Sequence, residues 1–314
     1  MQTTLKTSIA FVGTGLHSGK PVRLVIRPAA ADAGITFLRR DLIAGASDTD
    51  ASDAATIPAL WHLAEQSPLC TRLVNAAGAS VSTVEHVMAA LAGCGVHNAL
   101  VEVDGPEVPI LDGSARPFAA AILKAGLTTL EAPIRAIRIL RPVEVARGGA
   151  CARLSPADTL TIRFDISFPD AAIGQQSKTL KMSNGAFLRE LADSRTFCRQ
   201  ADVEAMQEQG LALGGTYSNA VVVDGEKVLS PGGLRHADEA VRHKMLDALG
   251  DLMLAGAPIL GLYEGDRAGH SLTNALLRAL MADRGAWELV ECDAEAADRL
   301  PGCNIRPADL AAVA

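Results

Sequence analysis

The sequence predicts an α+β protein made of two similarly built, layered domains. Both halves contain short runs of alternating apolar residues, which are typical of strands. Both also contain stretches with apolar residues three and four positions apart, which are typical of helices. The pattern is weakest at 127–133, so we predict domains at residues 1–130 and 131–314. The residues themselves show no repeat, so internal duplication is only weakly indicated.

The composition is that of an ordinary globular protein and excludes one broad class of partner. The 314 residues are 49% hydrophobic and 21% charged, which is enough for a sizeable core. The net charge of −7 argues against a nucleic-acid partner, because no basic excess exists to neutralise a phosphate backbone. A phosphate on a substrate must therefore be met by a few local Lys or Arg side chains.

The same survey bears on location and assembly. Six cysteines form no C-x-x-C pair and no regular spacing, which is typical of free thiols in a reducing compartment. The N-terminus lacks the basic start and apolar run of a signal peptide. No apolar run approaches the roughly 20 residues of a membrane span. We therefore expect a soluble, cytoplasmic, monomeric protein with no transmembrane segment.

The first elements are predicted to be strands. Residues 3–28 indicate a hairpin, because a turn at 13–21 leads into the alternating residues Val22, Leu24 and Ile26. His17 lies in this turn and is predicted to be solvated. Residues 41–68 are polar and rich in Ala and Asp, so we expect mostly loop with short elements. Strands are predicted at 69–75 and 98–103, and a helix at 117–126.

A helix is predicted from Ser82 to Gly93, with Ser82 as its N-cap. An apolar stripe follows at helical spacing, formed by Val84, Val87, Met88 and Leu91. Glu85 stands at the capping-box position, so its first interpretation is a helix cap. The functional interpretation is that Glu85 and His86 face a cleft from a helix start. A carboxylate base beside a metal ligand is what metal-assisted hydrolysis requires.

Two more residues of the first half have two interpretations each. Cys70 is either a small buried hydrophobe, the default for a free cysteine, or a thiol that lines a site. Asp112, followed by Gly113, is first of all a turn signal. It could also be a carboxylate that orients a ligand histidine.

The second half restarts with strands at 136–145 and 160–168, the latter a clean alternation of apolar residues. Helices are predicted at 185–191 and 200–210, a strand at 218–223 and a turn at Gly225. The chain is broken at 231–233 before its next helix. A buried strand at 257–262, a tight loop at 267–271 and a helix at 272–282 follow. The tail from Cys292 shows little beyond a short helix near Pro307.

The helix predicted at 240–251 has two different faces. His243, Asp247 and Asp251 recur every four residues on one face, with Lys244 beside them. The other face carries an apolar stripe that packs on a core, formed by Val241, Met245, Ala248 and Leu252. Two carboxylates one turn apart repel unless a cation is near, and His243 and Asp247 are placed to hold one divalent metal. A lone H-x-x-x-D motif is more often a solvated helix face.

Four separated motifs change that balance. They are Ser82-Thr-Val-Glu-His86, Ser194-Arg-Thr-Phe197, His243-Lys-Met-Leu-Asp247 with Asp251, and Gly269-His270. Together and in this order they resemble the UDP-3-O-acyl-N-acetylglucosamine deacetylases, zinc enzymes of bacterial lipid A synthesis. The resemblance extends to 15–19, 106–114 and 210–215, and it covers nearly the whole chain. It implies two α+β domains packed face to face, with the active site in the cleft between them.

The resemblance also implies a site. One catalytic Zn²⁺ is implied, held by His86, His243 and Asp247 with a place left for water. Glu85 matches the general base of the family. His270 matches a second catalytic residue, which is held by Asp251 and acts as an imidazolium. Thr196 matches a hydroxyl that stabilises the tetrahedral oxyanion.

The implied substrate is an acylated UDP-N-acetylglucosamine. Lys244 and Phe197 match residues that line the sugar and acyl side of the cleft, and 211–223 resembles an insert that forms a hydrophobic passage for the acyl chain. The other residues implied in substrate binding are Cys70, Leu16, Gly215 and Val222. Asp170 and Ala171 depart from the family, which has a His-Pro pair there. We expect that loop to face the nucleotide, so the departure concerns nucleotide contacts rather than the chemistry.

The implied chemistry agrees with the residue types. Zinc lowers the pKa of a water molecule to about 7 and polarises the acetamide carbonyl. Glu85 takes the proton of that water, and Thr196 and His270 help to meet the oxyanion. Glu85 or His270 then protonates the departing amine, which gives acetate and the free 2-amino sugar. Taken alone, His270 would be a surface-loop histidine, but an adjacent Asp251 keeps an imidazole charged near pH 7.

Three alternatives come from other classes. A zinc amidohydrolase with another substrate keeps every zinc argument. A protein that binds acylated sugar nucleotides without catalysis predicts neither bound zinc nor acetate release. A structural zinc site requires four protein ligands, often Cys, and no Cys lies in these motifs.

Overall fold

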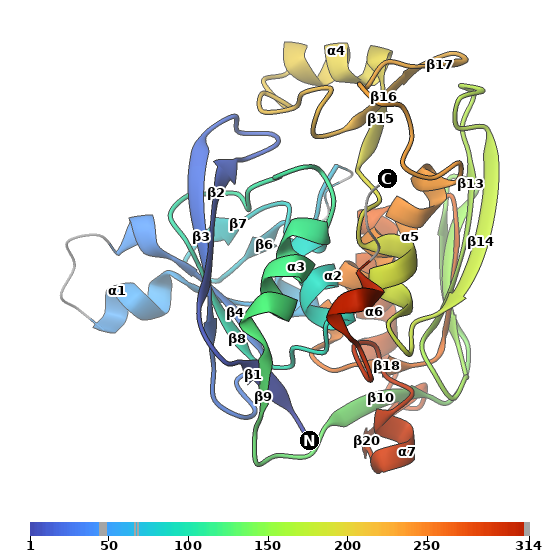
Figure 1. The fold of residues 1–314 in the computed structure, drawn as a ribbon. Coiled ribbons are helices and arrows are strands. Elements are labelled where there is room, and N and C mark those ends of the chain that lie inside the picture. Colours follow the sequence, from blue (N-terminus) through green and yellow to red (C-terminus); the bar gives the residue numbers. More distant parts are fainter. Residues whose placement is uncertain (44–48, 66, 68, 311–314) are drawn as a thin grey trace.

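The computed structural model of the chain has two halves, each with a five-stranded sheet outside and helices facing the other half (Figure 1). The structure describes residues 1–43, 49–65, 67 and 69–310. The predicted α+β class, with two layered halves that face each other, is confirmed. No described helix is long and apolar enough to cross a membrane.

The first sheet has the strand order β2-β3-β8-β4-β5. The predicted hairpin is present as β2 and β3, in which Ile9 lies opposite Ile26. The middle strand, β8, runs antiparallel to β3 and parallel to β4. In chain order the strands are β2 Ile9–Thr14, β3 Pro21–Pro28, β4 Ile35–Arg39, β5 Thr56–Pro58 and β8 Ala99–Val103.

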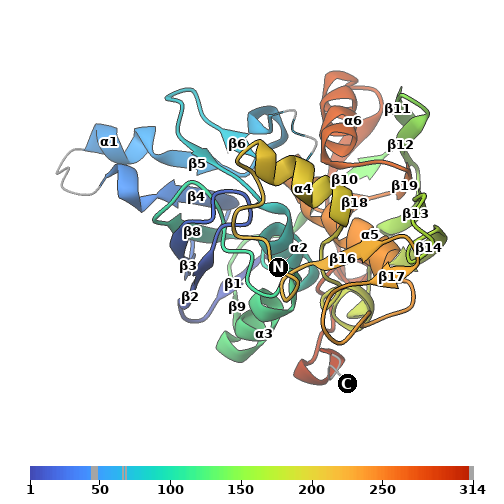
Figure 2. The same cartoon turned by 90° about the horizontal axis from the view of Figure 1, so that it is seen from above.

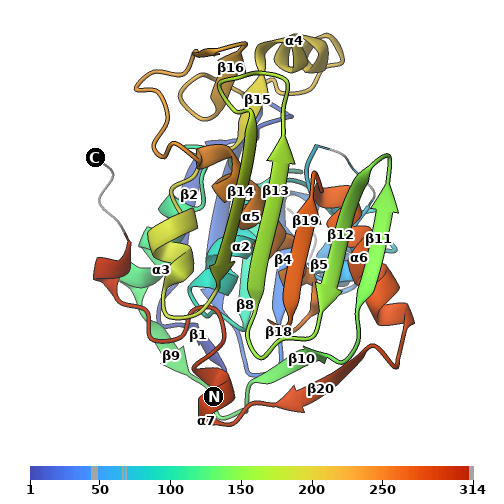
Figure 3. The same ribbon diagram turned by 90° about the vertical axis from the view of Figure 1, so that its right-hand side faces the viewer.

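The second sheet repeats this topology, with the order β11-β12-β19-β13-β14 (Figure 3). Its middle strand, β19, runs antiparallel to β12 and parallel to β13. A buried helix precedes the middle strand along the chain in both halves, α2 in the first and α5 in the second. The two halves therefore share one strand order and one set of strand directions. The strands are β11 Val143–Arg147, β12 Ala150–Ser155, β13 Thr161–Ser167, β14 Gln175–Lys181 and β19 Leu262–Asp266.

Helices α2 (Glu85–Gly93) and α5 (Glu239–Leu252) pack against each other between the two sheets (Figure 1). Helix α3 (Arg116–Ala125) packs on α2, and α6 (His270–Ala282) packs on α5. The apolar stripe predicted for 240–251 is buried. Gly250 permits the close crossing, because a Cβ at that position would stand 2.1 Å from the carbonyl oxygen of Glu85.

An arm of the second half extends beyond the helix layer (Figure 1). Its strands and helix are β15 Phe197–Arg199, α4 Gln200–Glu208, β16 Val221–Asp224 and β17 Lys227–Val228. The arm contains 211–223, the segment that resembles an acyl passage. Seen from above, α4 lies over the seam between the two halves (Figure 2).

Small sheets and short helices complete the described part of the chain. Three small sheets pair β1 (Thr3–Leu5) with β9 (Leu127–Thr129), β6 (Leu73–Val74) with β7 (Ser80–Val81), and β10 (Arg135–Ile139) with both β18 (Ile259–Leu260) and β20 (Trp287–Glu291). The short helices are α1 Thr49–Ala54, α7 Ala294–Ala297, a π-helical turn Phe187–Leu191 and 3₁₀ turns at Arg40–Leu42, Trp61–Leu63, Met253–Ala255 and Pro307–Asp309. The predicted domain boundary at 130/131 falls between β9 and β10 and stays a prediction.

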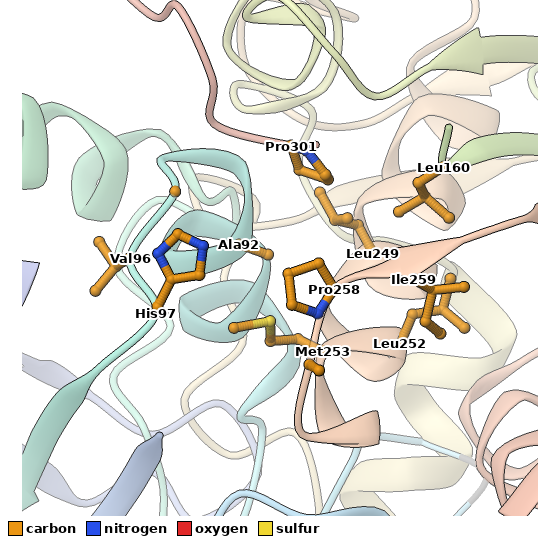
Figure 4. A pocket seen from close by; sticks show the side chains of 12 residues that line it. Ala92, Val96, His97, Leu160, Leu249, Leu252, Met253, Pro258, Ile259 and Pro301 are labelled. Atoms are coloured by element: carbon orange, nitrogen blue, oxygen red, sulfur yellow. The ribbon is translucent and has the colours of Figure 1, made fainter. Parts of the chain in front are cut away.

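One end of the α2–α5 interface closes around a small, mostly apolar cavity (Figure 4). Its volume is about 30 Å³. The walls come from both halves and include Ala92, Val96, Leu249, Leu252 and Pro258. Most of the walls are apolar, so apolar packing joins the halves at this end of the interface.

Several predicted boundaries differ from the structure. The strand predicted at 136–145 is divided into β10 and β11, because Pro142 cannot donate to a ladder and the chain changes sheets there. The strand predicted at 257–262 is divided at Gly261, where a Cβ would stand 2.7 Å from Cγ1 of Ile139. The strand predicted at 69–75 is limited to Leu73–Val74. The strand predicted at 218–223 begins only at Val221. Strands β4, β12, β14 and β20 were not predicted. Residues 44–48, 66 and 68 of the predicted loop lie outside the described residues.

Candidate active site

The other end of the α2–α5 interface collects the residues that the sequence motifs single out. His86 lies in the first turn of α2, His243 and Asp247 lie on α5, and His270 is the first residue of α6 rather than part of a loop. All four side chains are buried. Because α2 belongs to the first half and α5 and α6 to the second, the site forms where the halves meet.

His86, His243 and Asp247 form a compact group of potential metal ligands. One ligand atom of each lies within 4.8 Å of the others. Oδ1 of Asp247 is 3.2 Å from Nε2 of His243 and 3.6 Å from Nε2 of His86. In the described part of the chain, no other group of three or more His, Cys, Asp or Glu has this geometry. Two imidazole nitrogens and a carboxylate oxygen are a ligand set typical of zinc with an open position.

The hydrogen bonds and charges leave these ligand atoms available to a cation. Nδ1 of His243 lies 2.9 Å from the carbonyl oxygen of Ser194 and donates to it, so Nε2 is the nitrogen that faces the ligand group. Burial, together with His243, lowers the pKa of His86 to about 3, so this ring is neutral. Oδ1 of Asp247 has no hydrogen-bond partner among the described residues. A divalent cation would satisfy this carboxylate oxygen and the two imidazole nitrogens grouped with it, so the residues fit a metal.

The second oxygen of Asp247 is held by Lys244. Nζ of Lys244 donates to Oδ2 of Asp247 at 2.8 Å. Burial raises the pKa of Asp247, but His243, Lys244 and His270 outweigh it and hold the pKa well below its usual value. Asp247 is therefore ionised, as a metal ligand must be. Lys244, which the resemblance assigns to the substrate, is here the partner of a potential metal ligand.

Glu85 does not cap its helix. Helix α2 begins at Glu85 itself, its N-cap residue is Val84, and no side chain caps it. Ser82 cannot serve as the cap, because its N–H and carbonyl pair with Pro106 and Val108 in a strand-like bridge. The capping prediction for Ser82 and Glu85 is therefore wrong.

The Glu85 carboxylate faces the centre of the site instead. It accepts a hydrogen bond from the backbone N–H of Thr71 at 3.0 Å, and its other oxygen lies 3.7 Å from Nε2 of His270. Burial raises the pKa of Glu85, His270 lowers it, and Asp247 and Asp251 raise it further, to about 7. A carboxyl group with this pKa can both accept and release a proton at neutral pH.

His270 is held by Asp251. Nδ1 of His270 lies 2.9 Å from Oδ2 of Asp251, and the hydroxyl of Thr71 donates to the other oxygen of Asp251. Burial lowers the pKa of His270, but Asp251, Glu85 and Asp247 raise it more, to about 9. The ring is therefore positively charged at neutral pH. The sequence reasoning missed Thr71, because no spacing marks a residue that reaches the site from an irregular segment.

The loop that leads into β15 ends at Thr196, and Phe197, the first residue of β15, lies beside His243 of the metal group. The ring of Phe197 stands edge-on to His243, with 6.3 Å between the ring centroids. The backbone fixes Thr196, since its N–H donates to the carbonyl of Gly113 and its carbonyl accepts from Val221, both at 2.8 Å.

A buried ion pair locks this loop to α5. Nε of Arg195 lies 2.9 Å from Oε1 of Glu239, and both side chains are buried. The sequence reasoning missed Glu239, which stands four residues before His243. Extending the spacing of His243, Asp247 and Asp251 backwards by one turn finds it.

The remaining residues assigned to the substrate have varied surroundings. Leu16 and Gly215 meet where the first hairpin touches the arm, because the carbonyl of Leu16 accepts from the N–H of Gly214 at 2.9 Å and a Cβ on Gly215 would stand 3.5 Å from Cδ1 of Leu16. Val222 is buried in β16. Cys70 is buried as well, and burial raises the pKa of its thiol to about 12. This inert thiol agrees with the interpretation of Cys70 as a small apolar side chain.

The turn residues His17 and Asp112 differ in how well their side chains are hydrogen-bonded. His17 is not solvated as predicted, since both ring nitrogens are buried without a hydrogen-bond partner among the described residues. Burial also lowers its pKa. The described hydrogen bonds of Asp112 go to Ser114 and Arg235 rather than to a ligand histidine. The turn interpretation of Asp112 holds, with Gly113 at a φ of 84°.

Asp170, where the resemblance implied a His-Pro pair, attaches the arm. Its carboxylate accepts from the N–H of Gly225 at 2.9 Å and pairs with Arg199. Arg199 ends β15 and Gly225 follows β16, so one buried acidic residue ties the loop after β13 to two strands of the arm. The nucleotide contacts of this loop stay a prediction.

Comparison with known proteins points to one family. The sequence model described as UDP-3-O-acyl N-acetylglycosamine deacetylase matches residues 2–282. A protein named UDP-3-O-acyl-N-acetylglucosamine deacetylase from Phenylobacterium zucineum (strain HLK1) is 50% identical over 288 residues, which are 92% of this chain and 96% of the relative. A protein of the same name from Shewanella sp. (strain W3-18-1) is 44% identical over 297 residues, or 94% of each chain. A third, from Shewanella oneidensis, is 43% identical over 307 residues, with 96% and 97% covered.

Proposed function

Since the chain belongs to the UDP-3-O-acyl N-acetylglycosamine deacetylase family, we propose that it performs this deacetylation with a zinc ion held by His86, His243 and Asp247. The reaction removes the N-acetyl group of UDP-3-O-acyl-N-acetylglucosamine, a step of lipid A biosynthesis. The observation that carries the metal assignment is the buried group of three ligand atoms, with Glu85 and His270 beside it.

The protein supports such a metal through the states of its ligands. When bound there, zinc supplies a Lewis acid for the acetamide carbonyl and lowers the pKa of a water molecule to about 7. Ser194 fixes the tautomer of His243, burial keeps His86 neutral, and Lys244 helps to keep Asp247 ionised.

Glu85 accepts the proton of the attacking water. Its pKa of about 7 lets it take that proton at neutral pH and release it again. The Thr71 N–H holds one carboxylate oxygen, so the other stays directed at the centre of the site. The proton is then available for the departing amine.

His270 stabilises the negative charge that develops on the carbonyl oxygen. Asp251 binds Nδ1 of the ring, which leaves the charged Nε2–H facing the side of Glu85 and Asp247. We assign the hydroxyl of Thr196 to the same oxyanion. Protonation of the amine by Glu85 or His270 completes the reaction, and the products are acetate and the 2-amino sugar.

The arm supplies the binding surface for the acyl chain in this proposal. A cavity of about 450 Å³ lies between the first hairpin and the arm. Its walls include the apolar residues Val12, Leu111 and Leu213 and the polar residues Thr14, Thr216 and Asn219. We place the acyl chain along this side of the arm, with contributions from Leu16, Phe197, Gly215 and Val222, and the sugar near Lys244 and Cys70.

We also propose that the enzyme works in the cytoplasm as a monomer. Its six cysteines are free, as a reducing compartment favours. The ligand group, Glu85 and His270 all come from one chain, so a second copy is not needed to complete the site.

An acetate-release assay on acylated and unacylated UDP-N-acetylglucosamine tests this function. Each buried methylene contributes about 0.8 kcal/mol, so the substrate without its acyl chain should react far less efficiently at low concentration. Acetate release only from the acylated substrate supports the proposal. Equal efficiency with both substrates would show that no acyl passage operates, and no acetate from either would exclude the deacetylase.

A further inference from the structure

The chain enters α2 through an unfavourable backbone conformation at Thr83. The φ angle of this buried residue is 59°, in the left-handed region that β-branched side chains rarely adopt. Glu85 and His86 follow two and three residues later. Conformations of this kind persist only where surrounding contacts hold them, and they cluster at functional sites.

The neighbours of Thr83 explain why the chain must turn there. The N–H of Ser82 donates to the carbonyl of Pro106 at 2.9 Å, and the carbonyl of Ser82 accepts from the N–H of Val108 at 3.0 Å. Since α2 already begins at Glu85, the chain has two residues in which to leave this strand-like bridge and start the helix. Thr83 is the residue at which the chain turns from the bridge into the helix.

The carboxylate of Glu107 stabilises this turn from the other side of the bridge. Glu107 is 3% exposed, and its Oε1 accepts from the hydroxyl of Thr83 at 2.9 Å. The backbone N–H groups of His17 and Ser18 donate to its two oxygens, each at 2.9 Å. Gly15 allows this approach, because a Cβ there would stand 2.4 Å from Oε2 of Glu107. Three donors thus satisfy a carboxylate whose burial is otherwise costly.

We propose that Glu107 and Thr83 are positioning residues for the deacetylation. Glu107 holds Thr83 in its left-handed conformation, and that conformation aims Glu85 and His86 at the centre of the site. The inference rests on the proposed function, because it presupposes the role of Glu85. The 3.7 Å distance from Glu85 to His270 depends on where α2 begins. A displacement of about 1 Å in a reacting group can lower a rate by roughly 10²-fold.

Three threonine variants test the role of the hydroxyl. Thr83→Val keeps the shape and removes the hydroxyl, so kcat should fall about tenfold or more while KM changes little. Thr83→Ser keeps the hydroxyl and should restore kcat to near the wild-type value. Thr4→Val is the matched control, since Thr4 is also buried and donates its hydroxyl to the carbonyl of Asn98 at 2.7 Å, far from the site in the sequence. It should keep wild-type kcat.

Two glutamate variants test the partner. Glu107→Gln replaces one acceptor oxygen by an NH₂ donor that must face an N–H group, so it should lower kcat at least as much as Thr83→Val. Glu102→Gln is the control. Glu102 lies on β8 and its carboxylate pairs with Arg27 of β3, so this variant should leave kcat unchanged. The double variant Glu107→Gln/Thr83→Gly is a second test, which remains valid even if Thr83→Val does not fold. Glycine adopts positive φ without cost, so the double variant should regain part of the lost kcat.

Glu85→Gln is assayed beside these variants, and zinc content and thermal unfolding are measured for each protein. The results then separate this inference from the proposed function. An inactive Glu85→Gln together with wild-type turnover in Thr83→Val and Glu107→Gln would overturn the inference alone. The inference also fails if Thr4→Val loses as much activity as Thr83→Val, or if the glycine double variant regains nothing. A fully active Glu85→Gln would overturn both.

Discussion

At the scale of single residues, the same buried surroundings act oppositely on Glu85 and His270. Burial disfavours the charge on both groups, and Asp247 and Asp251 face both of them. For Glu85 these carboxylates add to burial, and its pKa rises to about 7. For His270 the carboxylates outweigh burial, and its pKa rises to about 9. One cluster therefore provides a group that can accept a proton beside a group that stays protonated.

Replacement of Glu85 by Gln isolates its basicity. Gln keeps the shape and can still accept the hydrogen bond from the N–H of Thr71, but it cannot take a proton from water. Acetate release should fall by roughly 10²–10⁴-fold, the usual contribution of a general base, while zinc content and unfolding temperature stay near wild type. Wild-type turnover in Glu85→Gln would contradict the assigned role.

The candidate site was predictable from the sequence where residues share one helix face. His243, Asp247 and Asp251 lie on one helix, so their spacing alone places them together. The capping interpretation of Glu85 failed because it depends on where the helix starts, and long-range pairing of Ser82 with 106–108 moves that start. The contacts of Thr71 and Glu107 join segments far apart in the chain, and no local pattern encodes them.

At the scale of elements, the crossing of α2 and α5 sets the geometry of the site. Gly250 lies against the carbonyl of Glu85, so the two helices can approach closely where the ligands converge. Elements with strong periodicity, such as α5 and β13, were predicted well. Strand β20 was missed because its residues are only partly buried and show little contrast between its two faces.

Replacement of Gly250 by Ala tests the crossing. Helix propensity alone favours Ala by about 1 kcal/mol in a helix interior. The added Cβ would stand 2.1 Å from the carbonyl oxygen of Glu85, and such overpacking typically costs about 1–3 kcal/mol or more. We expect a net loss of stability, seen as a lower unfolding temperature, together with lower kcat.

Gly285→Ala is the control for this variant, because the nearest atom to a Cβ there is 3.7 Å away. It should leave both the unfolding temperature and kcat near wild type. A Gly250→Ala protein that is more stable than wild type and fully active would show that the crossing is not as close as described.

At the scale of the whole molecule, the two halves share one strand order, and the site lies between their buried helices. The sequence predicted two similar α+β units, but it could not show that their sheets share one topology, because the residues themselves do not repeat. Each half contributes to the metal group, His86 from the first and His243 and Asp247 from the second. The zinc proposed for this group would therefore join the halves as well as serve the chemistry.

Zinc content measured by mass spectrometry, in parallel with acetate release, is the most direct test of a catalytic zinc held by His86, His243 and Asp247. Wild-type protein should contain about one zinc per chain, and His243→Ala and Asp247→Ala should lose both metal and activity because each removes one of three ligands. His97→Ala is the control, since His97 lines the cavity at the other end of the interface, and it should keep its zinc. A His243→Ala or Asp247→Ala protein with full zinc and full activity would show that these residues do not hold a catalytic zinc.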